Sequence, residues 1–281
     1  MRRLFLIVAS ILFLLGACSK KTEENNEQPL NNNEENISAE NLEENNQITN
    51  ENEAEEDFTG NNDEEDLAIE EEPQYKVNEV WSIVPIDDTA DENVVLLTID
   101  DAPEHYSLEM ARKLHELEAP AIFFVNGHFL QTEEQKEVLK EIYDLGFVIG
   151  NHTYGHKNLS EISDEEVREE IVSVNDMVEE IIGERPVFFR APFGIYSDYA
   201  RQVLKEENMT FMNWTYGYDW EADYMTKEAI ADIMVNTEYL RAGSNLLMHD
   251  RKWTAEALED IVKGLREKGY GFVDPLLIET N

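Results

Sequence analysis

The pattern that most constrains this chain is an alternation of short apolar runs with amphipathic segments between residues 76 and 281. Runs of a few apolar, often β-branched or aromatic residues are typical of β-strands that are buried on both faces. We therefore predict strands at 94–99, 121–125, 147–149, 187–189, 210–214 and 245–248.

Helical segments are predicted between these strands. The sequences TEEQ at 132–135 and SDEE at 163–166 have the form of a capping box, in which the first and fourth residues satisfy each other's free backbone groups. Gly146 and Gly183 are placed to end the two helices, and a last helix is predicted at 255–268. Repeated strand–helix units imply an α/β fold with a parallel sheet, either a small barrel or an open doubly wound sheet. Periodicity alone does not choose between the two.

The acidic charge of the chain is unevenly distributed. The chain has 62 Asp and Glu against 22 Lys and Arg, a net charge of −40. Residues 19–75 carry 20 of these acids, only 2 Lys and 13 Asn. This segment has too few apolar residues for their burial to offset the conformational entropy lost on folding. We therefore predict a disordered acidic tether. Cation binding by its Glu runs is an alternative, although charge runs are usually solvated. The acidity argues against nucleic acid as a partner.

The N-terminus reads as a secretory signal. Arg2 and Arg3 precede an apolar run at 4–15, which is shorter than the roughly 20 residues of a membrane-spanning helix. Gly16 and Ala17 follow, and then Cys18, which is the chain's only cysteine. This ending resembles a bacterial lipobox, which implies cleavage before Cys18 and lipidation of its thiol. An uncleaved anchor helix is the alternative.

Residues with reactive side chains follow the predicted strands, and the C-terminal ends of parallel strands meet at one edge of a sheet. Each of them alone has an ordinary structural explanation, such as turn chemistry or a surface charge. Together they supply three metal ligands, in Asp101, His152 and His156, and leave other groups for proton transfer. The complete set is Asp100, Asp101, His152, His156, Arg190, Asp219 and His249.

Five segments then resemble, in order, the five motifs of the polysaccharide deacetylase family, also called the NodB-homology domain or carbohydrate esterase family 4. They are TIDDA at 98–102, HTYGH at 152–156, RAPFG at 190–194, YGYDW at 216–220 and LMH at 247–249. The resemblance covers residues 76–281 and implies a distorted (β/α) barrel. It also implies a metal-dependent hydrolase that removes N-acetyl groups from a polysaccharide.

The resemblance assigns roles to the motif residues. One divalent metal ion is expected on Asp101, His152 and His156, with Zn²⁺ as first choice and Co²⁺, Mn²⁺ or Ni²⁺ as alternatives. Asp100 is expected to act as general base and Arg190 to orient it.

The remaining roles concern the oxyanion, the leaving amine and the acetyl group. The backbone N–H of Phe193 is expected to bind the oxyanion. His249, supported by Asp219, is expected to protonate the leaving amine. Trp220 and Leu247 are expected to line the acetyl methyl group, although plain core packing explains these two equally well.

The motifs depart from the family pattern at three positions. Ala102 replaces a glycine, which is acceptable unless φ is positive there. Ile99 replaces a phenylalanine, and Tyr216 replaces the first aspartate of the fourth motif. These changes bear on substrate preference and rate more than on the chemistry.

A lipid anchor and a tether would place the enzyme outside the cytoplasmic membrane, where peptidoglycan is the N-acetylated polymer within reach. We therefore expect an extracytoplasmic, membrane-anchored monomer that deacetylates N-acetylglucosamine in the wall. Poly-N-acetylglucosamine, chitin oligomers and acetylated xylan are alternative substrates. Two further alternatives are a non-catalytic wall-binding module and a lipoprotein whose acidic segment is the interaction element.

Overall fold

The computed structural model describes residues 72–281. The predicted signal sequence, Cys18 and nearly all of the predicted tether therefore lie outside the described residues. One boundary needs correction: strand β1 (Tyr75–Val77) begins within the expected tether range of 19–75. The side chain of Tyr75 is only 5% exposed and belongs to an apolar cluster with Ile83, Val94 and Ile278, so folded structure starts by residue 75.

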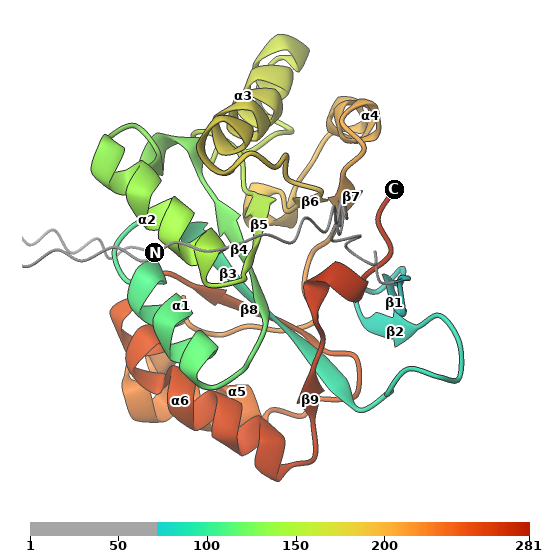
Figure 1. Ribbon diagram of the computed structural model, residues 1–281, viewed down its shortest axis with the longest axis vertical. Helices are drawn as coiled ribbons and strands as arrows, with labels where there is room; N and C mark the ends of the chain where they lie inside the picture. Colours follow the sequence, from blue (N-terminus) through green and yellow to red (C-terminus); the bar gives the residue numbers. More distant parts are fainter. Residues whose placement is uncertain (1–71) are drawn as a thin grey trace, which may run out of the picture. The chain divides into compact units, whose positions relative to one another are not determined.

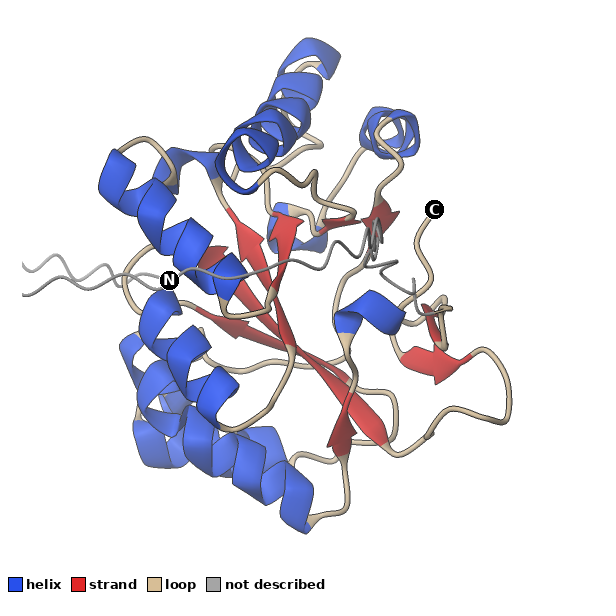
Figure 2. Ribbon diagram, viewed as in Figure 1, coloured by secondary structure: helices blue, strands red, loops and turns tan. Residues whose placement is uncertain are grey.

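A parallel sheet forms the centre of the fold (Figures 1 and 2). Its strands follow the order β7-β6-β5-β4-β3-β8, and β9 also pairs with β3. The strands are β3 (Val94–Ala102), β4 (Ala121–Val125), β5 (Val148–Asn151), β6 (Phe188–Phe189), β7 (Thr210–Phe211), β8 (Asn245–His249) and β9 (Gly271–Phe272). All six predicted strands are present. Among the strands of residues 72–281, the short β9 and the hairpin of β1 and β2 (Ile83–Pro85) were not predicted.

The sheet curls until its two edges meet. After β7 the chain runs alongside β8, where the Thr215 N–H donates to the Asn245 carbonyl at 2.9 Å and the Leu247 N–H donates to the Tyr216 carbonyl at 2.9 Å. Tyr216 and Leu246 form a parallel bridge. Since β7 itself is only two residues long, the closure is irregular. The result is the distorted barrel that the motif resemblance implied, and the open doubly wound sheet is excluded.

Helices surround the sheet (Figure 2). Both predicted capping boxes are formed, by Thr132 with Gln135 and by Ser163 with Glu166, and Gly183 ends its helix with φ of 81°. The helices are α1 (Ser107–Glu116), α2 (Glu133–Asp144), α3 (Asp164–Ile182), α4 (Asp198–Glu206), α5 (Lys227–Asn236) and α6 (Lys252–Glu267). Within residues 72–281, none of them has the length and apolar character needed to cross a bilayer.

Helices α1, α4 and α5 were not predicted. Helices α4 and α5 have local side-chain caps, at Ser197 and Thr226, whereas the cap of α1 comes from far along the chain. Its N-cap residue, Tyr106, makes no side-chain cap hydrogen bond. The Asp250 carboxylate instead accepts hydrogen bonds from the backbone N–H groups of His105, Tyr106 and Ser107, at 2.5–3.1 Å, and from the Ser107 hydroxyl at 2.6 Å. A carboxylate at this position accepts hydrogen bonds from the free N–H groups and interacts favourably with the positive end of the helix dipole.

The β1–β2 hairpin is attached to the barrel through Gly243. Strand β2 (Ile83–Pro85) begins with an N–H that donates to the Gly243 carbonyl at 2.8 Å, while the Gly243 N–H donates to the Val94 carbonyl at 2.7 Å. Gly243 has φ of 75°, and a Cβ atom added to it would lie 2.2 Å from the Ile83 carbonyl oxygen. Only glycine fits this junction.

Gly243→Ala should therefore destabilise the fold more than the matched substitution Gly183→Ala. Gly183 has a similar φ of 81°, but a Cβ atom there would meet nothing within 4 Å. We expect Gly183→Ala to lower the free energy of unfolding by about 1–2 kcal/mol from the left-handed backbone alone. Gly243→Ala should add about 1–3 kcal/mol of overpacking. Urea denaturation of the purified protein measures the difference, and equal losses would contradict the proposed contact.

Candidate active site

The motif residues gather around one cavity at the C-terminal ends of the barrel strands. Asp100 and Asp101 lie at the end of β3, and His249 is the last residue of β8. The cavity has a volume of about 410 Å³. It is lined by Asp100, Asp101, His152, His156, Ala191, Phe193, Trp214, Trp220, Leu247, His249 and Arg251. Arg190 and Asp219 lie behind this lining and are fully buried.

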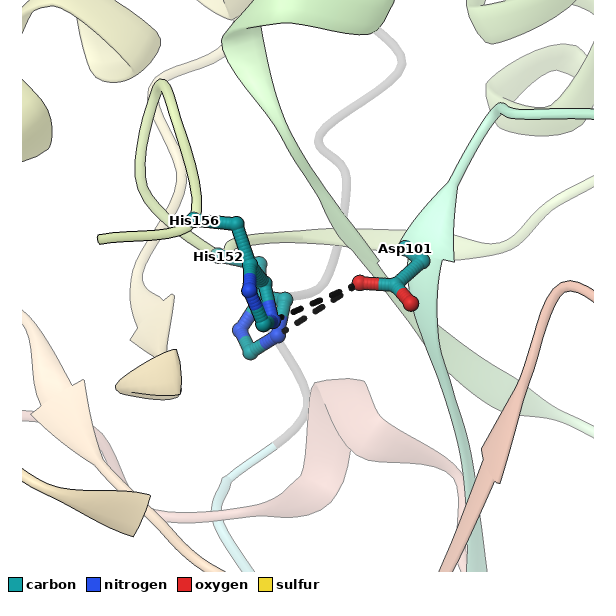
Figure 3. Close-up of side chains that lie close together, drawn as sticks. All are labelled: Asp101, His152 and His156. Atoms are coloured by element: carbon teal, nitrogen blue, oxygen red, sulfur yellow. Dashed lines mark ion pairs between the residues drawn. The ribbon is translucent and has the colours of Figure 1, made fainter. Parts of the chain in front are cut away.

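Asp101, His152 and His156 converge on one point (Figure 3). The Asp101 Oδ1 atom lies 3.9 Å from Nε2 of His152 and 3.6 Å from Nε2 of His156. Donor atoms about 2.0–2.2 Å from one zinc ion at tetrahedral angles lie roughly 3.4 Å apart. The spacing therefore fits a shared divalent cation.

The tautomer of His152 also fits a metal ligand. Its Nδ1 lies 2.8 Å from the Arg190 carbonyl oxygen, which can only accept a hydrogen bond, so Nδ1 carries the proton. The Nε2 lone pair is then turned toward the two aspartates. A ligating histidine whose other ring nitrogen donates to a carbonyl is the usual arrangement in metal sites.

The two histidines are carried by a strained loop. Thr153 and His156 have φ values of 67° and 54°, which are uncommon for residues other than glycine. Asn126 holds this loop by donating to the His152 carbonyl at 2.6 Å, and the buried Glu170 carboxylate accepts from the Gly155 N–H at 2.7 Å. Asp101 and Phe193, also at the cavity, have φ of 63° and 60°. Strained backbone is typical of functional sites, where the surroundings enforce it.

The surroundings of Asp101 and His156 shift the pKa values of both side chains. Burial alone would raise the pKa of Asp101, but the nearby imidazoles, led by His152, and Arg251 outweigh it, so the pKa lies below its ordinary value. Burial, followed by the charge of His152, lowers the pKa of His156. An ionised carboxylate beside a neutral imidazole is the protonation state that metal binding requires.

Asp100 is paired with Arg190 inside the barrel. The Arg190 Nη1 atom donates to Asp100 Oδ1 at 2.8 Å and to the Thr98 hydroxyl at 2.7 Å. The guanidinium also lies over the Phe124 ring, 4.4 Å from its centroid. Burial lowers the pKa of Arg190 and the negative charge of Asp100 opposes that shift. The pair leaves Asp100 Oδ2 directed toward His152 Nε2, at 3.6 Å.

His249 is paired with Asp219. Its Nδ1 lies 2.6 Å from Asp219 Oδ1, and its backbone N–H donates to Asp219 Oδ2 at 2.6 Å. The Thr254 hydroxyl also donates to Asp219 Oδ2, and the Trp253 indole N–H donates to the Asp219 backbone carbonyl, both at 2.8 Å. Burial lowers the pKa of His249, but the charge and hydrogen bond of Asp219 raise it more, so the net pKa is raised. This favours the imidazolium form.

The apolar side of the cavity contains more than the expected residues. Trp220 lies edge-to-face with the His249 ring at 5.4 Å and is 44% exposed. Leu247 is 3% exposed and Phe193 is 61% exposed. Trp214 and Arg251 line the cavity too, and the sequence analysis missed both. Trp214 ended a predicted strand, and Arg251 directly follows the His249-Asp250 pair. Their positions at strand ends could therefore have indicated that both line the site.

The departures from the motif pattern are accommodated. The left-handed conformation in the first motif occurs at Asp101 and not at Ala102, so alanine needs no glycine-like backbone there. Tyr216 is 4% exposed and its hydroxyl donates to the Met234 carbonyl at 2.8 Å. It supports the closure of the barrel and does not line the cavity.

Comparison with known proteins agrees with this geometry. A profile of the polysaccharide deacetylase family matches residues 87–212. A peptidoglycan-N-acetylmuramic acid deacetylase of Bacillus subtilis (strain 168) is 29% identical over 195 residues, which are 67% of this chain and 73% of that protein. A chitooligosaccharide deacetylase of Azorhizobium caulinodans is 31% identical and covers 65% of this chain and 92% of its own length.

Solved structures are similar as well. The peptidoglycan deacetylase PdaC from Bacillus subtilis matches with a TM-score of 0.59 and 30% identity, over 66% of this chain and 90% of that chain. A pseudoenzyme of carbohydrate esterase family 4 from Bacillus anthracis matches with a TM-score of 0.59 and 26% identity, over 66% of each chain. The five motifs, the curled parallel sheet and these likenesses together show that the chain belongs to the polysaccharide deacetylase family and is a polysaccharide N-deacetylase.

Proposed function

We propose that this enzyme is metal-dependent, that it acts outside the cytoplasmic membrane, and that its substrate is peptidoglycan. One observation supports this chemistry. A triad suited to a metal ion lies in the same cavity as an aspartate that is paired with Arg190 and a histidine that is paired with Asp219. A base and an acid with opposite electrostatic surroundings are what amide hydrolysis needs.

A divalent ion held by Asp101, His152 and His156 would polarise the acetyl carbonyl and make a water molecule more acidic. Asp100 accepts the proton of that water. Arg190 fixes Asp100 through Oδ1, which leaves Oδ2 to accept the proton. The oxygen of the water bonds to the amide carbon, and the backbone N–H of Phe193 donates to the oxygen that becomes negative.

His249 completes the reaction as the acid. Its Nδ1 is held by Asp219, so Nε2 is the ring nitrogen free to donate a proton to the departing amine. The carbon–nitrogen bond breaks, and acetate and a free sugar amine are released. Trp220 and Leu247 supply apolar surface for the acetyl methyl group, with Trp214 beside them.

Two observations support peptidoglycan as the substrate and an extracytoplasmic location. Similar proteins include peptidoglycan deacetylases that act on N-acetylmuramic acid or N-acetylglucosamine, according to their names. The lipobox-like ending at Cys18 and the acidic segment at 19–75 fit a lipid-anchored enzyme with reach into the wall. We propose Zn²⁺ as the ion because two imidazoles and one carboxylate are a common zinc donor set.

Acetate release tests the substrate and the metal together. The purified protein should release acetate from peptidoglycan sacculi faster than from chitooligosaccharides, poly-N-acetylglucosamine or acetylated xylan. A chelator should stop the release and added Zn²⁺ should restore it. Mass spectrometry of digested sacculi then identifies the deacetylated sugar. Binding to sacculi without metal-dependent release from any polymer would favour the non-catalytic wall-binding module.

Paired aspartate variants separate the base from the metal ligand. Asp100→Asn should keep zinc affinity but lower turnover by about 10²–10⁴-fold, because the proton acceptor is lost. Asp101→Ala should lose both zinc binding and activity. His115→Ala is the control, since His115 lies on α1 outside the cavity and its side chain hydrogen-bonds to the Leu145 carbonyl. Full acetate release by Asp100→Asn would exclude Asp100 as the base.

The pH profile tests the acid. Asp219 raises the pKa of His249, and the imidazolium form is the active one, so activity should fall as pH rises through that pKa. Asp219→Asn removes the negative charge, lowers the pKa of His249 and should move the alkaline limb of kcat/KM to lower pH. Asp232→Asn on α5 removes a charge outside the cavity and should leave the limb in place. An unmoved limb in Asp219→Asn would contradict the assignment.

A further inference from the structure

The turn between β8 and α6 contacts both the end of β3, where Asp101 lies, and the loop that follows β3. Arg251 lies in this turn, directly after the buried Asp250. Its Nη2 donates to Asp101 Oδ2 at 2.9 Å, and its Nη1 donates to Glu104 Oε2 at 2.8 Å and to the Asp250 carbonyl at 3.1 Å. A single guanidinium thus bridges the Asp101 carboxylate at the end of β3 and the Glu104 carboxylate in the loop that follows.

The backbone of the same loop is fixed by the neighbouring residue. Asp250 accepts hydrogen bonds from the N–H groups at the start of α1, and its own N–H donates to the Asp100 carbonyl at 3.0 Å. Asp250 therefore anchors the main chain on both sides of Asp101. Arg251 in turn orients the Asp101 side chain.

The two oxygens of Asp101 have separate partners as a result. Oδ1 faces the Nε2 atoms of both histidines, and Oδ2 is taken by Arg251. The Asp101 side chain is 14% exposed and the Arg251 side chain 35%, so this ion pair is only partly open to solvent. A carboxylate held in this way presents one oxygen to the metal position while the guanidinium engages the other.

A positive charge near a cation site has an opposing effect, since like charges repel. Here the guanidinium is shared with Glu104, which offsets much of its charge. Outer partners that orient metal ligands generally raise metal affinity. The orienting effect should therefore exceed the repulsion.

We propose that Arg251 is a positioning residue that holds Asp101 in a one-oxygen binding geometry and thereby strengthens divalent-metal binding. The inference rests on the metal site of the proposed function. Glu104 is the anchor that keeps the guanidinium in place.

Zinc affinity of the full chain tests the proposal without any need for turnover. Competition with a chromophoric chelator should show about 10- to 100-fold weaker zinc binding in Arg251→Met. Arg251→Lys keeps the charge but cannot bridge both carboxylates, so it should restore only part of the affinity. Arg112→Met is the control, because Arg112 pairs with Glu141 on the exposed surface and its loss removes the same charge.

Glu104→Gln keeps the test decisive if Arg251→Met folds poorly. It leaves Asp101 and Arg251 intact and should weaken zinc binding in the same direction by a smaller factor, with the melting temperature of the metal-free protein unchanged. Unchanged or tighter zinc binding in Arg251→Met, or in Glu104→Gln if the first variant does not fold, overturns the proposal. Full recovery by Arg251→Lys also overturns it, since charge alone would then suffice. Failure of the wild-type protein to bind zinc would instead remove the proposed metal site itself.

Discussion

The buried ion pair between Arg190 and Asp100 is the interaction on which the rest of the site depends. Arg190 leaves β6, crosses the interior of the barrel and reaches Asp100 and Thr98 on β3. Its Nη2 atom donates to the Asn213 carbonyl, in the segment after β7, and to the side chain of Asn245 on β8. A fully buried cation is stable only when it is paired and hydrogen-bonded, so these strands must meet around it.

Arg190 also connects Asp100, the proposed base, to the metal-binding triad. The Arg190 side chain fixes Asp100, while its backbone carbonyl accepts the Nδ1 proton of His152. One position therefore sets both the direction of the base and the tautomer of a metal ligand. The second pair joins His249, at the end of β8, to Asp219 in a turn of the segment after β7, and the metal triad lies between the two pairs. The fold thus provides opposite electrostatic environments within a cavity of about 410 Å³.

Local patterns predicted much of this architecture. The six strands, the two capping boxes and the glycine that ends α3 were all readable because each depends on residues adjacent in the chain. Helix α1 was not readable, since Asp250 caps it from more than 140 residues away. The short strands β1, β2 and β9 and the helices α4 and α5 were not predicted either. Trp214 was taken for a strand residue, although it lines the cavity.

The sequence by itself determined the strand–helix alternation, the motif residues and their order after successive strands. It also determined the family resemblance, because five spaced motifs specify more than any single one. Only the tertiary structure decided that the sheet closes between β7 and β8, that one oxygen of Asp101 faces the histidines, and that Arg251, itself bound to Glu104, holds the other. The physical reason is that local propensity acts over a few residues, whereas strand closure and side-chain orientation depend on contacts between residues distant in the chain.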